Sequence, residues 1–96
     1  MMLNNKQIKA LKAEAHHLKT TVSIGSKGIT NQVISEITNT INFHELIKIQ
    51  IQSDTKEDRL KIAKEICQAT ESEFVQLIGK QAVIFKRKDE ESKFSI

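Results

Sequence analysis

The sequence contains no proline, no tryptophan and no tyrosine, and it has only one cysteine and three glycines. The single cysteine, Cys67, cannot form an intramolecular disulfide, so we expect a reducing compartment, the cytoplasm. No apolar run approaches the roughly 20 residues that span a bilayer, and the polar start MMLNNKQIKA differs from a secretory signal. All the aromatic residues are phenylalanine, so the core must consist mainly of aliphatic side chains.

The sequence also lacks the residue clusters that metal and catalytic sites require. His16 and His17 are adjacent and cannot share one face of a helix, and His44 stands alone before an expected strand. Cys67 lies in an apolar helical pattern, which favours a core position over a nucleophile. We therefore expect no metal, no cofactor and no catalysis. A small hydrolase or transferase using His16 or His44 is the enzymatic alternative, but no partner residues accompany either histidine.

The charge of the chain is unevenly distributed. Its net charge is only +3. Residues 1–28 and residues 75–88 each carry a net charge of +4, whereas residues 54–73 carry −2. Two basic segments thus flank a mildly acidic one, a pattern that favours a partner with negative charge, such as a nucleic acid.

Hydrophobic periodicity predicts one domain over residues 1–88 with the order α-β-α-β-α-β-β, followed by a polar tail at 89–96. Helices are expected over about 5–18, 31–42 and 55–70, and strands over 20–24, 45–52, 73–79 and 81–87. Strand–helix–strand connections favour parallel neighbours, and the short turn at Gly79 favours an antiparallel hairpin. The expected fold is therefore α/β: a four-stranded mixed sheet with helices packed on it.

Local signals support several of these boundaries. Asn4 is the expected N-cap of the first helix, with Gln7 completing a capping box, and Thr30 is the expected N-cap of the second helix. The segment ELIKIQIQ alternates isoleucine with lysine and glutamine, which predicts a strand with one buried and one solvated face.

The segment GSKG, residues 25–28, joins the first expected strand to the second expected helix. Gly25 and Gly28 allow the backbone to approach a ligand closely, and the N-terminus of the following helix favours anions. Lys27 adds a full positive charge, and Ser26 completes the loop. These features suit a phosphodiester backbone. The tetrapeptide alone equally allows a simple tight turn, and it is neither a Walker A loop nor a dinucleotide-binding motif.

Lysines form a second candidate binding surface. Lys9, Lys12, His16 and Lys19 follow helical spacing and predict a basic stripe on the first helix, leading into the strand that ends at the glycine loop. A solvated lysine face is the alternative explanation. Further candidates for RNA contact, whose faces the sequence does not fix, are Lys48, Lys80, Lys86 and Arg87.

The aromatic residues argue against base stacking. Phe74 and Phe85 fall in expected strands, where core packing can bury them, and tyrosine and tryptophan are absent. If the chain binds RNA, we expect it to hold the backbone through glycine N–H groups and lysines.

Three segments, LKAEAHHLKTTVSIGSKGIT, HELIKIQI and LIGKQAVIFKR, together resemble the CRM domain family and its small bacterial YhbY-like members. The resemblance runs from about Asn4 to Arg87. Within it, Gly25 and Gly28 match the G-x-x-G loop of the family, residues 44–48 its H-E-L-I-K segment, and residues 78–80 its I-G-K turn. The resemblance implies an α/β RNA-binding domain with the glycine loop on its RNA-facing surface. It also implies a role in assembly of the large ribosomal subunit.

These observations together predict a non-enzymatic protein that binds structured ribosomal RNA through the glycine loop and nearby cations. The alternative from a different class is a protein–protein adaptor in ribosome biogenesis that uses the sheet or the acidic third helix and touches RNA incidentally.

Overall fold

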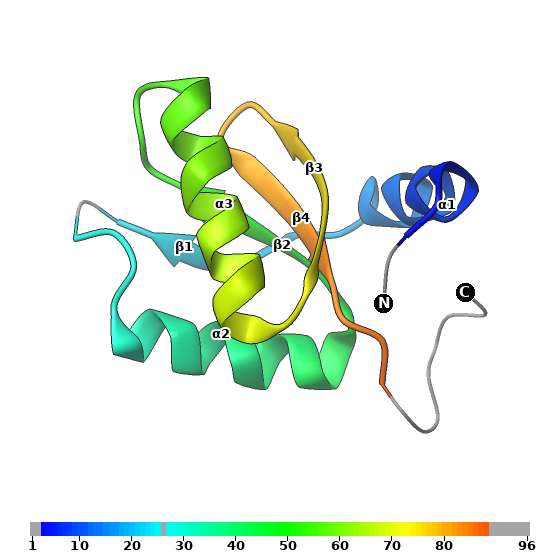
Figure 1. The fold of residues 1–96 in the computed structure, drawn as a ribbon, viewed down its shortest axis with the longest axis horizontal. Helices are drawn as coiled ribbons and strands as arrows, with labels where there is room; N and C mark the ends of the chain where they lie inside the picture. Colours follow the sequence, from blue (N-terminus) through cyan, green and yellow to red (C-terminus); the bar gives the residue numbers. More distant parts are fainter. Residues whose placement is uncertain (1–2, 26, 89–96) are drawn as a thin grey trace.

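Three helices and four strands follow one another in the predicted order (Figure 1). The computed structural model describes residues 3–25 and 27–88, so the predicted tail at 89–96 lies outside the described residues. The elements are α1 (Asn5–Ala15), β1 (Thr20–Ile24), α2 (Asn31–His44), β2 (Leu46–Ile51), α3 (Lys56–Thr70), β3 (Glu73–Ile78) and β4 (Gln81–Phe85). The order and the mixed four-stranded sheet confirm the predicted α/β fold.

Strand β2 lies inside the sheet, whose strand order is β1-β2-β4-β3. β1 pairs with β2 in parallel through the α2 crossover, and β4 pairs antiparallel with both β2 and β3. The turn between β3 and β4 contains Gly79 at φ +57°, a conformation that glycine adopts without steric cost. The predicted parallel pair and the predicted hairpin are both present.

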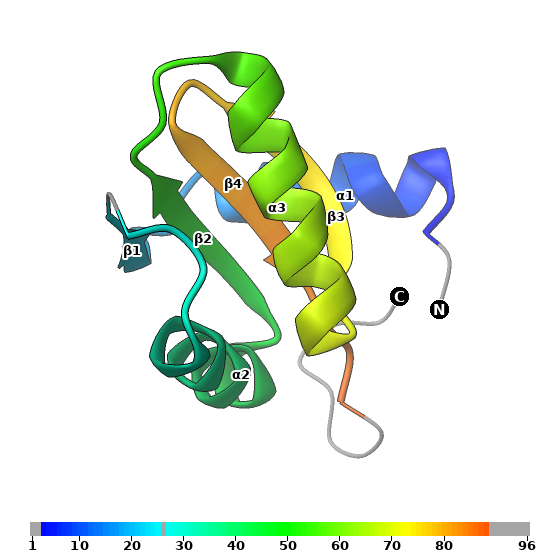
Figure 2. The ribbon, with the colours of Figure 1, turned by 60° about the vertical axis from the view of Figure 1, so that its left-hand side comes forward.

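Helices α2 and α3 cover one face of the sheet, and α1 lies on the other face, passing behind β3 and β4 in Figure 2. On β2, the side chains of Ile47, Ile49 and Ile51 pack under α2 and α3 and are at most 1% exposed. Their helix partners include Ile37, Ile41, Ala63 and Ile66. The apolar stripes predicted for the second and third helices therefore form the main core.

The alternation in the sequence predicted that the second face of β2 is solvated, but the structure shows that this face is only partly solvated. Leu46, on the same face as Lys48 and Gln50, is buried beneath Leu11 and Ala15 of α1. Phe85 of β4 completes this smaller cluster and is fully buried. Helix α1 covers only the part of the face near the start of β2, so Lys48 and Gln50 remain half-exposed.

The predicted N-caps are confirmed, but α1 is shorter than predicted. The N–H of Gln7 donates to Asn4 Oδ1 at 2.8 Å, the N–H of Asn4 donates to Gln7 Oε1 at 2.9 Å, and Thr30 caps α2. At the other end of α1, His17 and Leu18 donate to carbonyls three residues back, which tightens and ends the helix at Ala15. Leu18 still packs on the smaller cluster from the connection to β1.

The attachment of α1 to the sheet can be tested with Leu11→Ala. Leu11 is fully buried, so removing its side chain leaves a cavity and should lower the free energy of unfolding by about 2–5 kcal/mol. The neighbouring, exposed Lys12→Ala should change it by less than about 0.5 kcal/mol. Urea denaturation of both variants measures the difference. A cost below about 1 kcal/mol for Leu11→Ala would show that α1 does not dock as described.

Candidate nucleic-acid interface

The glycine loop links the end of β1 to the start of α2. The N–H of Gly28 donates to the carbonyl of Gly25 at 3.0 Å, which closes a turn of four residues. Gly28 has φ +69°, whereas Gly25 is not in the left-handed region. A Cβ atom added at either glycine would meet no atom within 4 Å. Both glycines therefore face open space, and Ser26 between them lies outside the described residues.

Backbone donors of α2 point toward this loop. Thr30 Oγ1 accepts the N–H of Val33 at 3.1 Å, and the carbonyl of Thr30 accepts the N–H of Ile34. Among the described residues, no acceptor is found for the N–H groups of Asn31 and Gln32, as is usual in a first helical turn. An open hollow of about 490 Å³ borders the loop and is lined by Gly25, Lys27, Gly28, Thr30, Gln32 and Val33. Free N–H groups beside the exposed Lys27 favour an anion.

Lys80 lies at the same end of the sheet as the glycine loop. It occupies the turn between β3 and β4, and its carbonyl accepts the N–H of Ile51 at 2.7 Å. Ile51 is the register partner of Ile24, the residue before Gly25. Lys27 and Lys80 thus extend from neighbouring connections, although more than fifty residues separate them in the sequence.

Lys48 lies between this end of the sheet and α1. Its register partner is Thr20, which follows Lys19 in the connection from α1. We call the part of this surface that α1 leaves uncovered the open face. It comprises Ser23, Lys48, Gln50, Gln76, Ile78 and Gln81.

The predicted four-residue stripe on the first helix is wrong in part. Lys9 and Lys12 are exposed on α1, but His16 is its C-cap and Lys19 lies beyond its end. His16 keeps the right-handed helical conformation, with its N–H bonded to the carbonyl of Lys12, so only Lys19 falls outside the helical spacing on which the stripe depended. In Figure 1, α1 and the loop end of β1 lie at opposite sides of the molecule. A basic path from α1 to the loop therefore has to cross the open face, through Lys19 and Lys48.

Lys86 and Arg87 lie away from the glycine loop. They follow β4, whose last residue, Phe85, pairs with Leu46 at the start of β2. Lys86 Nζ donates to the carbonyl of Thr70 at 3.2 Å, at the C-terminus of α3, where a cation is favourable. Its N–H also donates to the carbonyl of Glu45 at 2.8 Å. These bonds give Lys86 a structural role at the far end of the sheet.

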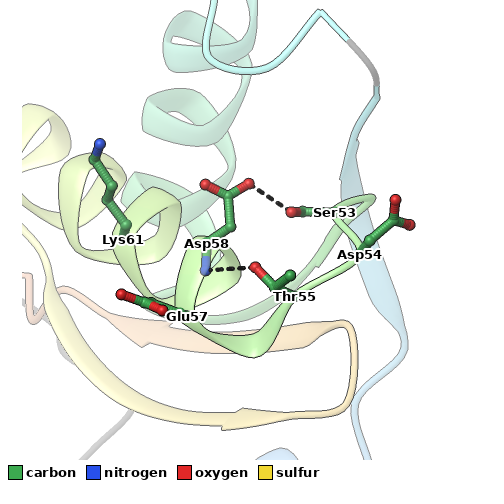
Figure 3. A pocket seen from close by; sticks show the side chains of 6 residues that line it. All are labelled: Ser53, Asp54, Thr55, Glu57, Asp58 and Lys61. Carbon is green, nitrogen blue, oxygen red and sulfur yellow. Dashed lines mark hydrogen bonds between the residues drawn. The ribbon is translucent and has the colours of Figure 1, made fainter.

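A larger hollow, of about 660 Å³, lies at the N-terminus of α3 (Figure 3). The Asp58 carboxylate points toward Ser53, whose Oγ donates to Asp58 Oδ2 at 2.5 Å, and the backbone N–H of Asp58 donates to Thr55 Oγ1 at 3.1 Å. Asp54 and Glu57 add further negative charge beside Lys61. This arrangement caps the helix, and its charge disfavours a nucleic acid.

Cys67 is a core residue, as predicted. Its side chain is 7% exposed and packs in the cluster beneath α2 and α3. Burial raises the pKa of the Cys67 thiol to about 11, so the thiolate needed for nucleophilic attack is scarce near neutral pH. Across residues 3–25 and 27–88, no three histidine, cysteine or acidic side chains are grouped to hold a metal ion.

None of the helices in the described ranges has both the length and the apolar character that crossing a membrane requires.

An exposed aromatic side chain was not assigned from the sequence. Phe43, near the end of α2, is 64% exposed. The ring of His44 lies edge-on to it at 4.8 Å, and Lys88 Nζ lies 5.5 Å from its centroid. Helical periodicity places Phe43 off the apolar stripe formed by Ile37 and Ile41, and this offset is the signal that could have identified it.

Comparisons with known proteins show what this chain is similar to. Residues 3–86 match the CRS1/YhbY (CRM) domain. An RNA-binding protein of Haemophilus influenzae is 38% identical over 98% of this chain and 94% of its own length. A protein of Pseudomonas aeruginosa, named as a probable RNA-binding protein, is 33% identical over 97% of this chain and 89% of its own.

A solved structure shares the whole fold. The solution structure of a Staphylococcus aureus protein, described as a candidate RNA-binding protein, superposes with a TM-score of 0.89. The two sequences are 33% identical, and the match covers 99% of each chain.

The conformational difference between the two loop glycines predicts different effects of alanine. Gly28→Ala places a Cβ at a positive φ and should lower the free energy of unfolding by about 1–2 kcal/mol. Gly25→Ala meets neither strain nor a neighbouring atom, so it should be neutral or stabilise by up to about 1 kcal/mol. Urea denaturation compares the two variants. A larger loss for Gly25→Ala than for Gly28→Ala would contradict the loop geometry.

Proposed function

Because this chain belongs to the CRS1/YhbY (CRM) domain family, we propose that it is an RNA-binding protein that holds the phosphate backbone with its glycine loop. Lys27 and Lys80 neutralise phosphates at the loop end of the sheet. Lys48 and Lys19 continue the contact across the open face toward Lys9, Lys12 and His16. Ser26 belongs to the proposed site through its place in the sequence.

The observation that carries this proposal is the convergence of three anion-binding features at one place. The N–H groups of Asn31 and Gln32 have no acceptor among the described residues, and Gln32 lines the hollow beside the loop. Gly25 adds no side chain there, so the backbone is accessible to a bulky phosphodiester. Lys27 supplies a full charge. Relatives of nearly the same length are named as RNA-binding proteins, which supports RNA as the source of the phosphates.

We extend the proposal to ribosomal RNA and to assembly of the large ribosomal subunit, in the cytoplasm and without catalysis. The resemblance to small bacterial YhbY-like proteins supports the target. The raised pKa of Cys67 and the bond that the Asp58 carboxylate accepts from Ser53 Oγ at the start of α3 support a binding role without catalysis. Lys86 and Arg87 are the weakest members of the proposed site, since they lie at the far end of the sheet.

Charge changes in the loop test the proposed site. Gly25→Asp adds a carboxylate beside the phosphates and should weaken binding of single-stranded RNA about 5- to 10-fold, whereas Gly25→Asn adds a similar shape without charge and should weaken it much less. If four to six phosphates are contacted, log K for the wild type should fall with log salt at a slope of about −3 to −4. Lys27→Gln should make that slope shallower by about 0.7.

Fluorescence anisotropy with labelled RNA at several salt concentrations provides these values. Equal RNA affinities of Gly25→Asp and Gly25→Asn, in correctly folded protein, would show that the loop is only a turn and does not contact phosphates. An RNA affinity of the wild type that does not change with salt concentration would contradict electrostatic binding of the backbone.

A further inference from the structure

The open face carries a row of side chains suited to hydrogen-bonding the edges of unpaired bases. One cross-strand row contains Ser23 of β1, Gln50 of β2, Gln81 of β4 and Ile78 of β3, each the register partner of the next. We call these four residues the amide row. With about 4.8 Å between neighbouring strands, the row is roughly 14 Å long. It lies immediately before the glycine loop and the turn that holds Lys80.

A bulge in β1 brings Ser23 onto this face. The pairing shifts between Thr20 and Val22, so Thr20 stays opposite Lys48 while Val22 turns into the core. Ser23 then lies opposite Gln50. Gln81 Nε2 donates to Thr20 Oγ1 at 3.1 Å, which places the Gln81 amide across β2 and holds it on the open face.

Apart from the bond between Gln81 Nε2 and Thr20, the amide row offers polar groups that are not hydrogen-bonded within the described structure. No hydrogen bond to the side chain of Gln50 is found among the described residues, and both Gln50 and Gln81 are half-exposed. Each amide presents both a donor and an acceptor, which is what recognition of a base edge requires. Ile78 is 58% exposed and provides apolar surface against which a base can pack.

We propose that the amide row binds unpaired RNA bases and gives the protein its sequence preference, while the glycine loop and lysines hold the backbone. This inference rests on the proposed RNA-binding function. RNA is favoured as the occupant because Lys48 lies beside the row and Lys80 and Lys27 lie at its end. The acidic side chains at the N-terminus of α3 belong to the helix-covered side of the sheet.

The test compares the sequence preferences of the wild type and of row variants on a pool of random single-stranded RNA, with sequencing of the bound fraction. Gln50→Ala and Gln81→Ala should each reduce discrimination between preferred and disfavoured bases about 2- to 10-fold. Gln81→Ala also removes the bond to Thr20, so Gln50→Ala is the cleaner variant.

A matched pair controls for charge. Gln50→Glu keeps the shape of the side chain but repels phosphates, so it should weaken binding of all RNAs severalfold. Gln68→Glu makes the same change at an exposed position of α3, on the opposite side of the sheet, and should bind like the wild type.

The outcomes separate this inference from the proposed function. If Gly25→Asp weakens binding but the row variants keep the wild-type profile, only the inference is overturned. That result would also follow if a protein partner occupied the row. If the wild type binds no RNA, the proposed function fails and the inference fails with it.

Discussion

The pairing of β2 with β1 on one side and β4 on the other is the constraint on which the rest of the structure depends. Ile47, Ile49 and Ile51 on one face of β2 bury themselves under α2 and α3, while Leu46 on the other face is buried under α1. Five elements thus contact a strand of six residues: two neighbouring strands and three helices. A one-residue shift in the register of β2 would move its isoleucines to the wrong face.

This arrangement also determines where the binding groups lie. Because β1 and β2 are parallel, both end at the same edge of the sheet, and the antiparallel β3–β4 hairpin turns there as well. The glycine loop and the first turn of α2, which follow one another in the sequence, therefore lie at the same end of the sheet as Lys80, which is distant from them in the sequence. Helix α1 occupies the other end of its face, so the part next to the glycine loop stays open.

The far end of the sheet has a different character. The connection between α2 and β2 is a single residue, Glu45, which is fully buried and has φ +67°. Its carbonyl accepts the N–H of Lys86, and its Oε2 accepts the N–H of Lys88 at 3.5 Å. These bonds join the chain after β4 to the junction of α2 and β2. The side chain of Lys86 also donates to the carbonyl of Thr70, so this cation stabilises the fold at the far end of the sheet.

Local signals in the sequence predicted most of the elements. The side chains of Asn4 and Thr30 cap helices where predicted, and Gly79 turns the hairpin, because caps and turns depend on a few neighbouring residues. The predicted end of α1 was wrong because the apolar spacing continues to Leu18, which packs on the sheet from outside the helix.

Non-local features could not be obtained in this way. Predicting the burial of Leu46 requires knowing where α1 docks, and the alternation of residues within one strand does not give the position of α1. The amide row depends on the register of four strands and on a bulge in β1, so Gln50 and Gln81 appear unrelated in the sequence. The glycine loop was identified because its residues are contiguous. Its neighbour Lys80 was identified only as a candidate for RNA contact, because the sequence did not show where it lies on the surface.

Photo-crosslinking of the full chain to RNA in cells, with sequencing of the attached RNA and mass spectrometry of the modified peptides, tests most directly whether the glycine loop and the open face bind ribosomal RNA. We expect precursor RNA of the large ribosomal subunit, attached to peptides that contain residues 23–32, 48–50 or 78–81. Crosslinks confined to α3, or the absence of ribosomal RNA from the attached fraction, would contradict this binding mode.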